Sequence, residues 1–176
     1  MNYIFLLIIS FLTIHSDMQN NNFVKTEKKY WTIVNDGVMG GLSSSEIIET
    51  EEKTLIFSGL VSLENNGGFA SVRYNDNFKV NKDTKLKIKL IGDSKDYQIR
   101  IKSSRFTRYS YSKTIQTSSD IQTIIIPLNE FSAQFRGFNI DKENFNYNRL
   151  QEIGFLIGNK KSEKFRLEIV EIEIIN

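Results

Sequence analysis

Alternation of apolar and polar side chains runs through most of this 176-residue chain and constrains its fold more than any other feature. The clearest cases are residues 85–90 (KLKIKL) and 97–102 (YQIRIK), where every second side chain is apolar. This pattern is typical of strands with one buried and one solvated face, because amphipathic helices repeat about every 3.6 residues instead. Gly92, Asp93 and Ser94 lie between the two segments and favour a turn, so the sequence predicts a hairpin there.

Similar patterns predict further strands at residues 54–63, 69–74, 108–116, 121–128, 152–158 and 164–175. In the last of these the apolar positions change phase after Ile169, which indicates a β-bulge. Pro127 has no backbone N–H, so we expect it to end its strand or to lie on an edge strand.

Helix is scarce in this pattern. We expect a short turn at residues 129–131 and one or two helical turns at 143–150. Many short strands with little helix predict an all-β, mostly antiparallel sandwich or jelly roll in a single domain. A closed barrel is the alternative.

The first residues have a different character. Residues 3–14 form an apolar stretch of twelve residues, whereas a transmembrane helix needs about 20. The stretch fits the apolar region of a signal peptide, with Ser16 before the cleavage site, and no transmembrane anchor is expected in the mature chain. Export to the periplasm or to a membrane surface would follow. The alternative is a translation start at Met18, which would leave the protein in the cytoplasm.

These observations divide the chain into three parts: a signal peptide at residues 1–16, a polar spacer at 17–29 and the β-sandwich domain at 30–176. The domain is long enough to bury a core without covalent staples. Trp31, near its start, is expected to anchor that core, because an indole buries a large apolar area.

Composition removes several catalytic mechanisms. The chain has no cysteine, and its one histidine, His15, lies in the expected signal peptide. Catalytic triads with histidine, cysteine nucleophiles and sites of zinc bound by Cys or His are therefore excluded from the mature domain. Carboxylate, Lys, Tyr or an oxygen-ligated cation site remains available for chemistry. A hydrolase that uses paired carboxylates, such as Asp36 and Glu64 in a glycosidase-like arrangement, is the catalytic alternative. We predict a protein that is not an enzyme, with no catalytic residue and no cofactor.

Charge gives little sign of a nucleic-acid partner. The formal net charge is +2, and Lys residues alternate with Asp and Glu along the chain. No basic block of the kind that follows a phosphate backbone is present in the sequence. We therefore expect no nucleic acid to bind.

Two glycine-containing stretches, at residues 31–43 (WTIVNDGVMGGLS) and 57–73 (FSGLVSLENNGGFASVR), stand out. Each contains residues that accept the left-handed conformation of tight turns. Their paired glycines also allow a close approach of two backbones, or of a backbone and a bound group. These glycine pairs are Gly40 with Gly41 and Gly67 with Gly68.

The two stretches resemble the complex I intermediate-associated protein 30 family. Its hallmark is a Trp followed by an Asn-Asp-Gly-Val-Met-Gly-Gly run, and then a Glu-Asn-Asn-Gly-Gly-Phe segment that ends in Arg. The resemblance continues more loosely through Gly92, Asp93, Tyr97, Pro127, Phe131, Arg136, Gly137, Gly154, Phe155 and Phe165. It implies a galactose-binding-like jelly roll and a non-catalytic role in assembling NADH:ubiquinone oxidoreductase or another membrane complex.

The candidate binding site follows from these stretches. We expect the two loops to contact a protein partner, such as a subunit of a membrane complex, or a ligand. The candidate residues are Asn35, Asp36, Gly37, Met39, Gly40, Gly41, Glu64, Asn65, Asn66, Gly67, Gly68 and Arg73. Arg73 is expected to pair with Asp36 or Glu64 and so join the loops.

Carbohydrate binding is an alternative function. A carbohydrate-binding module is the alternative to an assembly factor, and Tyr109 and Tyr111, with Arg105 and Arg108 nearby, are the candidate aromatic patch for stacking on a sugar. Cross-strand packing is the other use of these tyrosines. Asp36, Glu64 and Asp93 are more simply turn-capping residues than ligands of a hard cation, so we predict no metal site.

Overall fold

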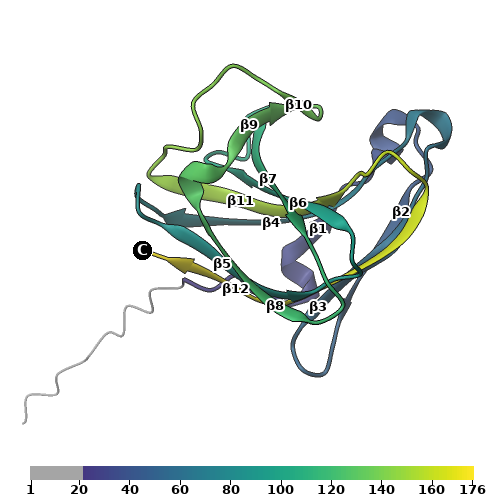
Figure 1. Ribbon diagram of the computed structural model, residues 1–176, viewed down its shortest axis with the longest axis horizontal. Coiled ribbons are helices and arrows are strands. Elements are labelled where there is room, and N and C mark those ends of the chain that lie inside the picture. The colour runs from purple at the N-terminus through teal and green to yellow at the C-terminus, as the bar shows by residue number, and fades with distance from the viewer. Residues whose placement is uncertain (1–21) are drawn as a thin grey trace, which may run out of the picture.

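The computed structural model describes residues 22–176, so the expected signal peptide and residues 17–21 of the expected spacer lie outside the described residues. Two antiparallel sheets form two layers (Figure 1). The first, seven-stranded, has the order β1 (Trp31–Ile33), β4 (Ala70–Lys79), β11 (Arg149–Ile157), β6 (Asp96–Lys102), β7 (Ser110–Gln116), β9 (Ser132–Phe135) and β10 (Phe138–Asn139).

The second sheet has five strands, in the order β2 (Ser44–Glu49), β3 (Leu55–Val61), β12 (Glu163–Ile175), β5 (Lys85–Ile91) and β8 (Ile121–Pro127). Four short 3-10 turns complete the elements: η1 (Lys28–Tyr30), η2 (Asp36–Met39), η3 (Glu64–Asn66) and η4 (Leu128–Glu130). The prediction of an all-β antiparallel sandwich with very little helix is confirmed. The sheets stay separate, so the closed barrel is wrong.

A single core lies between the sheets and is filled by the inward-facing side chains of both. Trp31 belongs to it, as predicted, with 6 % of its surface exposed. Its ring lies 5.4 Å from that of Tyr74 and 6.2 Å from that of Phe155, measured between centroids. The indole Nε1 donates a hydrogen bond of 2.8 Å to the carbonyl of Lys25, so its polar atom is satisfied.

The hairpin predicted for residues 85–90 and 97–102 is wrong. Both segments are strands, but β5 pairs with β12 and β8 in one sheet, whereas β6 pairs with β11 and β7 in the other. The connection crosses between the sheets at Gly92, where an added Cβ would lie 2.1 Å from Oγ1 of Thr117. Alternation identifies the buried face of each strand. It does not show to which sheet the strand belongs, because both sheets bury one face against the same core.

Two local predictions are confirmed and one is wrong. The register of β12 against β5 shifts between Ile169 and Glu171, which is the predicted bulge. Pro127 ends β8, an edge strand of the five-stranded sheet. The helix expected at residues 143–150 does not form, because β11 begins at Arg149 and the preceding loop is anchored by the buried Phe145.

The domain begins earlier than the expected boundary at residue 30. Phe23 forms a β-bridge with Glu173, and the N–H of Val24 donates to the carbonyl of Ile172 over 2.9 Å. Val24 is buried in the core. The part of the expected spacer from Asn22 onward is therefore tied to β12. Within residues 22–176, no helix is long and apolar enough to cross a membrane.

Candidate functional site

The carboxylate of Asp36 lies at the centre of the two glycine-containing loops. Its Oδ2 accepts hydrogen bonds from the backbone N–H of Gly68 over 2.7 Å and of Phe69 over 3.1 Å. Its Oδ1 accepts one from the N–H of Ser43 over 3.0 Å, and the Ser43 hydroxyl donates to Oδ2. The side chain is buried, with 1 % of the residue exposed. Asp36 therefore binds the first loop to the second.

The pKa of Asp36 reflects this setting. Burial raises it, but the hydrogen bonds from Ser43, Gly68 and Phe69 favour the charged form and together bring the pKa below its ordinary value. The group is thus a carboxylate at neutral pH, with its oxygens committed to donors of its own chain.

Glycine is required where the loops meet this carboxylate. A Cβ on Gly41 would lie 2.4 Å from Cγ of Asp36 and 2.8 Å from Cα of Gly67, and one on Gly67 would lie 2.5 Å from the carbonyl oxygen of Ser62. The close approach that these glycines allow is therefore between the two loops themselves. Gly40 ends η2 with φ +88°, in the left-handed region.

Asn65 and Asn66 take up the left-handed conformation expected of them, with φ 53° and 60°. They form η3, which lies beside η2 at one end of the sandwich (Figure 1). Asn35 contributes differently, because its side-chain oxygen accepts a hydrogen bond of 2.9 Å from the Ser45 hydroxyl. Glu64 is exposed.

Apolar side chains project from the paired loops into solvent. Val38 is 78 % exposed and Met39 is 61 % exposed, while Leu42 and Leu63 are each about half exposed. We call these four residues the apolar rim. Met39 was a candidate from the sequence, but its three apolar neighbours were not, because their exposure depends on how the loops fold.

Arg73 does not join the loops. The predicted ion pair with Asp36 or Glu64 is wrong, since neither carboxylate lies within ion-pair distance of Arg73 in the described residues. Arg73 lies instead on β4, in a cross-strand row that continues through Gly154 of β11, Arg100 of β6 and Ser112 of β7. The flanking residues Val72, Phe155 and Ile99 face the core, so this row lies on the outer face of the seven-stranded sheet.

A small hollow of about 80 Å³ lies over this row. We call it the basic hollow, because five basic side chains line it beside a single carboxylate, Glu152. The basic side chains belong to Arg73, Arg100, Lys102, Arg108 and Arg136. The sequence analysis placed Arg73 with the two glycine-containing loops and Arg108 beside the aromatic patch, and it did not predict this hollow.

The predicted aromatic patch is mostly buried. Tyr111 is 2 % exposed and belongs to the core cluster, and Tyr109 packs against it edge-on with 5.7 Å between ring centroids. Tyr147 completes the group, with its hydroxyl 3.1 Å from that of Tyr111 and 3.3 Å from that of Tyr109. These hydrogen bonds lower the pKa of Tyr147. Tyr147 is 39 % exposed and is the most open ring of the three.

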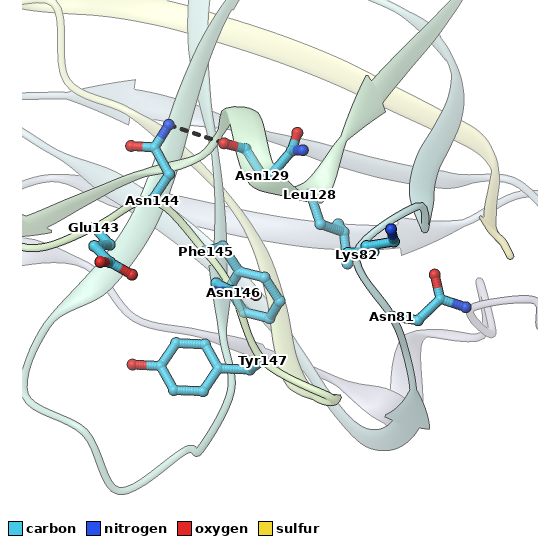
Figure 2. A pocket seen from close by; sticks show the side chains of 9 residues that line it. All are labelled: Asn81, Lys82, Leu128, Asn129, Glu143, Asn144, Phe145, Asn146 and Tyr147. Atoms are coloured by element: carbon cyan, nitrogen blue, oxygen red, sulfur yellow. Dashed lines mark hydrogen bonds between the residues drawn. The ribbon is translucent and has the colours of Figure 1, made fainter.

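A larger hollow of about 420 Å³ lies beside Tyr147 (Figure 2). Side-chain amides dominate its lining, and Figure 2 shows Phe145 and Tyr147 on one side with Asn81 and Lys82 across from them. The Asn144 amide donates a hydrogen bond of 2.8 Å to the carbonyl of Asn129, as the dashed line marks. We call it the asparagine hollow; its amides belong to Asn81, Asn129, Asn144 and Asn146.

Asp93 lies apart from the two loops. Its oxygens accept hydrogen bonds from the ammonium group of Lys95, the hydroxyl of Tyr97 and the backbone N–H of Arg166. Asp93 therefore braces the crossing between the sheets. Residues 22–176 contain no group of three or more acidic or histidine side chains arranged to hold a metal ion.

Several solved structures with a similar fold are carbohydrate-binding modules. The Family 11 module from Clostridium thermocellum in complex with a β-1,3-1,4-mixed-linked tetrasaccharide is 16 % identical, with TM-score 0.65 over 88 % of this chain and 95 % of that one. The Family 11 module of the cellulosomal cellulase Lic26A-Cel5E of the same organism is 16 % identical, with TM-score 0.56 over 80 % and 87 %. At such identities the likeness shows the fold alone.

No curated protein sequence matches the chain. A family model does: the one described as Complex I intermediate-associated protein 30 matches residues 18–169. That range contains both glycine-containing loops and the strands of both sheets up to the bulge of β12. The chain therefore belongs to the complex I intermediate-associated protein 30 family.

Proposed function

We propose that this protein is a non-catalytic assembly factor or scaffold that docks a protein partner through the apolar rim. The observation that carries the proposal is the buried Asp36 carboxylate, which holds both loops from inside while Val38 and Met39 point into solvent. Exposed apolar groups on a pre-organised loop bind with little loss of conformational entropy.

The family supports the kind of partner. The family model covers both glycine-containing loops, and the family description names an intermediate of complex I. We infer that the partner is a protein subunit of NADH:ubiquinone oxidoreductase or of another membrane complex. Before assembly such a subunit exposes apolar surface that is later covered, which suits the chemistry of the rim.

The arrangement of carboxylates supports a non-catalytic role. The two oxygens of Asp36 accept hydrogen bonds from Ser43, Gly68 and Phe69, so the group is committed to holding the loops. Glu64 is exposed to solvent on η3. Asp36 thus holds the two loops together, and Glu64 is a surface residue.

The experiment is affinity purification of the tagged full chain from its own host after mild detergent treatment. We expect subunits of a membrane complex to be recovered in fixed proportion to the bait. Recovery of the bait alone from every membrane and aqueous fraction would count against an assembly role.

Carbohydrate binding is the second candidate, and the asparagine hollow favours it. Amide groups donate to and accept from sugar hydroxyls, and a partly exposed ring such as Tyr147 gives a face for a pyranose. The module of similar fold from Clostridium thermocellum was solved in complex with a β-1,3-1,4-mixed-linked tetrasaccharide. We expect retardation of this chain in gels containing mixed-linked β-glucan, and less retardation for Tyr147→Ala; free migration of both proteins would exclude this ligand.

A further inference from the structure

The basic hollow concentrates like charge on the outer face of the seven-stranded sheet. On the five-stranded sheet, Lys87 pairs with two carboxylates, Glu171 at 3.4 Å and Glu173 at 2.8 Å. On the outer face of the seven-stranded sheet, Arg73 and Arg100 occupy the same cross-strand row with only Gly154 between them. Two guanidinium groups so placed repel each other unless an anion lies near both.

Arg100 is the most constrained of these groups. Its guanidinium donates two hydrogen bonds to Oε1 of Gln98, at 3.1 Å from Nε and 2.8 Å from Nη2. Burial lowers the pKa of Arg100, the neighbouring Arg73 lowers it further, and Glu152 acts in the opposite direction. Within residues 22–176, Arg100 forms no ion pair with a carboxylate.

Glu152 does not neutralise the hollow. It is 7 % exposed, and its Oε1 lies 3.6 Å from the ammonium group of Lys102. Lys102 also donates a hydrogen bond of 3.1 Å to the carbonyl of Thr107, which holds the pair in place. This ion pair accounts for one positive and one negative charge, so the four arginines that line the hollow have no carboxylate of their own there.

A second observation also calls for a ligand. Gln134 lines the hollow, and its Oε1 is buried without a hydrogen-bond partner in residues 22–176, while its Nε2 donates to Oδ1 of Asn139 over 2.9 Å. A buried amide oxygen of this kind is unfavourable unless a donor reaches it. A hydroxyl group would satisfy it.

The space fits a charged group. Since roughly 10 to 15 Å³ is enough to hold one water molecule, a hollow of about 80 Å³ has room for several waters or for one oxyanion. Gly154 leaves the floor bare, and a Cβ there would lie 2.7 Å from the carbonyl oxygen of Val72 and 3.4 Å from Cγ of Arg73. The floor between the two arginines is therefore formed by backbone, with no room for a side chain at position 154.

We propose that the basic hollow is a binding site for one oxyanion, a phosphate or a carboxylate, carried by a small ligand that also has a hydroxyl group. Arg73 and Arg100 hold the oxyanion from the two sides of Gly154, Arg108 and Arg136 enclose it, and the hydroxyl donates to Gln134. Planar guanidinium groups match such oxyanions with paired hydrogen bonds. The site lies on a different surface from the apolar rim and does not depend on it.

Isothermal titration calorimetry of the full chain at low ionic strength tests the site. The probes are inorganic phosphate, D-glucuronate, acetate and D-glucose, of which acetate has the charge without the hydroxyl and glucose has hydroxyls without the charge. We expect phosphate or glucuronate to bind at least about tenfold more tightly than acetate or glucose, because each of them can satisfy both the guanidinium groups and the Gln134 oxygen. Whichever of the two binds more tightly identifies the carrier of the oxyanion.

Three variants locate the binding. Arg100→Gln removes a half-buried guanidinium that is held by Gln98, and Arg108→Gln removes an exposed one at little risk to folding. Both should weaken binding of the favoured anion by about tenfold or more. Lys164→Gln removes one positive charge from an exposed position on β12 in the other sheet and should leave binding unchanged.

The proposal is overturned if neither phosphate nor glucuronate binds the wild-type chain, or if Arg108→Gln and Lys164→Gln affect binding equally. Tight binding of glucose to both arginine variants would also overturn it. Neither result bears on the docking of a protein partner at the apolar rim, because the substitutions leave Val38 and Met39 in place.

Discussion

Oδ2 of Asp36 lies 2.7 Å from the backbone nitrogen of Gly68, although the two residues are 32 positions apart in the chain. This contact joins the loop after β1 to the loop after β3, and through them it joins the two sheets at one end of the sandwich. Both the stability of this end and the presentation of the apolar rim follow from it.

Substitution Asp36→Asn tests the charge of this contact. The amide keeps one acceptor oxygen but turns a second, donating group toward backbone N–H groups that need an acceptor. We expect a loss of about 2 to 3 kcal/mol in the free energy of unfolding, measured by urea denaturation. Asp120→Asn, at an exposed position in a turn, is the control and should change stability by less than about 0.5 kcal/mol. Equal effects of the two substitutions would contradict the bracing role.

Gly41 and Gly37 lie in the same loop, but an added methyl group should affect the stability of the protein at only one of them. Gly41→Ala places a Cβ 2.4 Å from Cγ of Asp36, whereas Gly37→Ala meets nothing within 4 Å. Overpacking of this kind costs about 1 to 3 kcal/mol, so Gly41→Ala should lower the urea midpoint clearly. Gly37→Ala should leave it nearly unchanged. A Gly41→Ala protein as stable as Gly37→Ala would show that the loops separate easily.

Acid should weaken this end of the sandwich. The pKa of Asp36 in the folded protein lies below its ordinary value of 3.8, so the unfolded chain binds a proton at a higher pH than the folded one. The stability that the carboxylate contributes is therefore fully present above about pH 5 and is lost as the pH falls through the folded pKa. Urea midpoints of wild type and Asp36→Asn, followed between pH 7 and pH 2.5, should converge in acid; a constant difference would contradict the assignment.

The tyrosine group makes a separate prediction. Tyr147→Phe removes the hydroxyl that lies 3.1 Å from the hydroxyl of the buried Tyr111. We expect the free energy of unfolding to fall by about 1 kcal/mol, the usual net value of one hydrogen bond. Tyr30→Phe removes a hydroxyl from a ring of nearly the same exposure, 37 % against 39 % for Tyr147, and is the matched control. Thermal unfolding of the two variants side by side measures the difference.

The strands with clear alternation are predicted from the sequence because alternation is local, whereas β1, β2, β9 and β10 are missed. Residues 97–102 alternate perfectly, and the structure has β6 there, with Arg100 and Lys102 on the outer face as the pattern requires. Which strand lies beside another depends on contacts between distant parts of the chain. The wrong hairpin between β5 and β6 arises from this, since turn residues between two strands are equally compatible with a crossing between sheets.

In the candidate sites, too, local features were predictable from the sequence, whereas contacts between distant residues were not. Glycines at positions 41 and 67 indicated a close approach of backbones, but that the approach is to Asp36 follows only from the packed loops. The basic hollow could not be found from sequence, because Arg73, Arg100 and Gly154 become neighbours only through the register of three strands. Tyr147 was missed for a related reason, since it lies in a loop without periodicity.

The central claim is that the protein docks a partner through the apolar rim. The most direct test compares three tagged full-length chains in affinity purification from the native host: wild type, Val38→Ser with Met39→Ser, and Phe106→Ser. Phe106 is 82 % exposed on a different loop and controls for the loss of a surface apolar group. We predict that wild type and Phe106→Ser recover the same subunits of a membrane complex and that the double variant, with an unchanged urea midpoint, loses them. Equal recovery by all three proteins would contradict the claim.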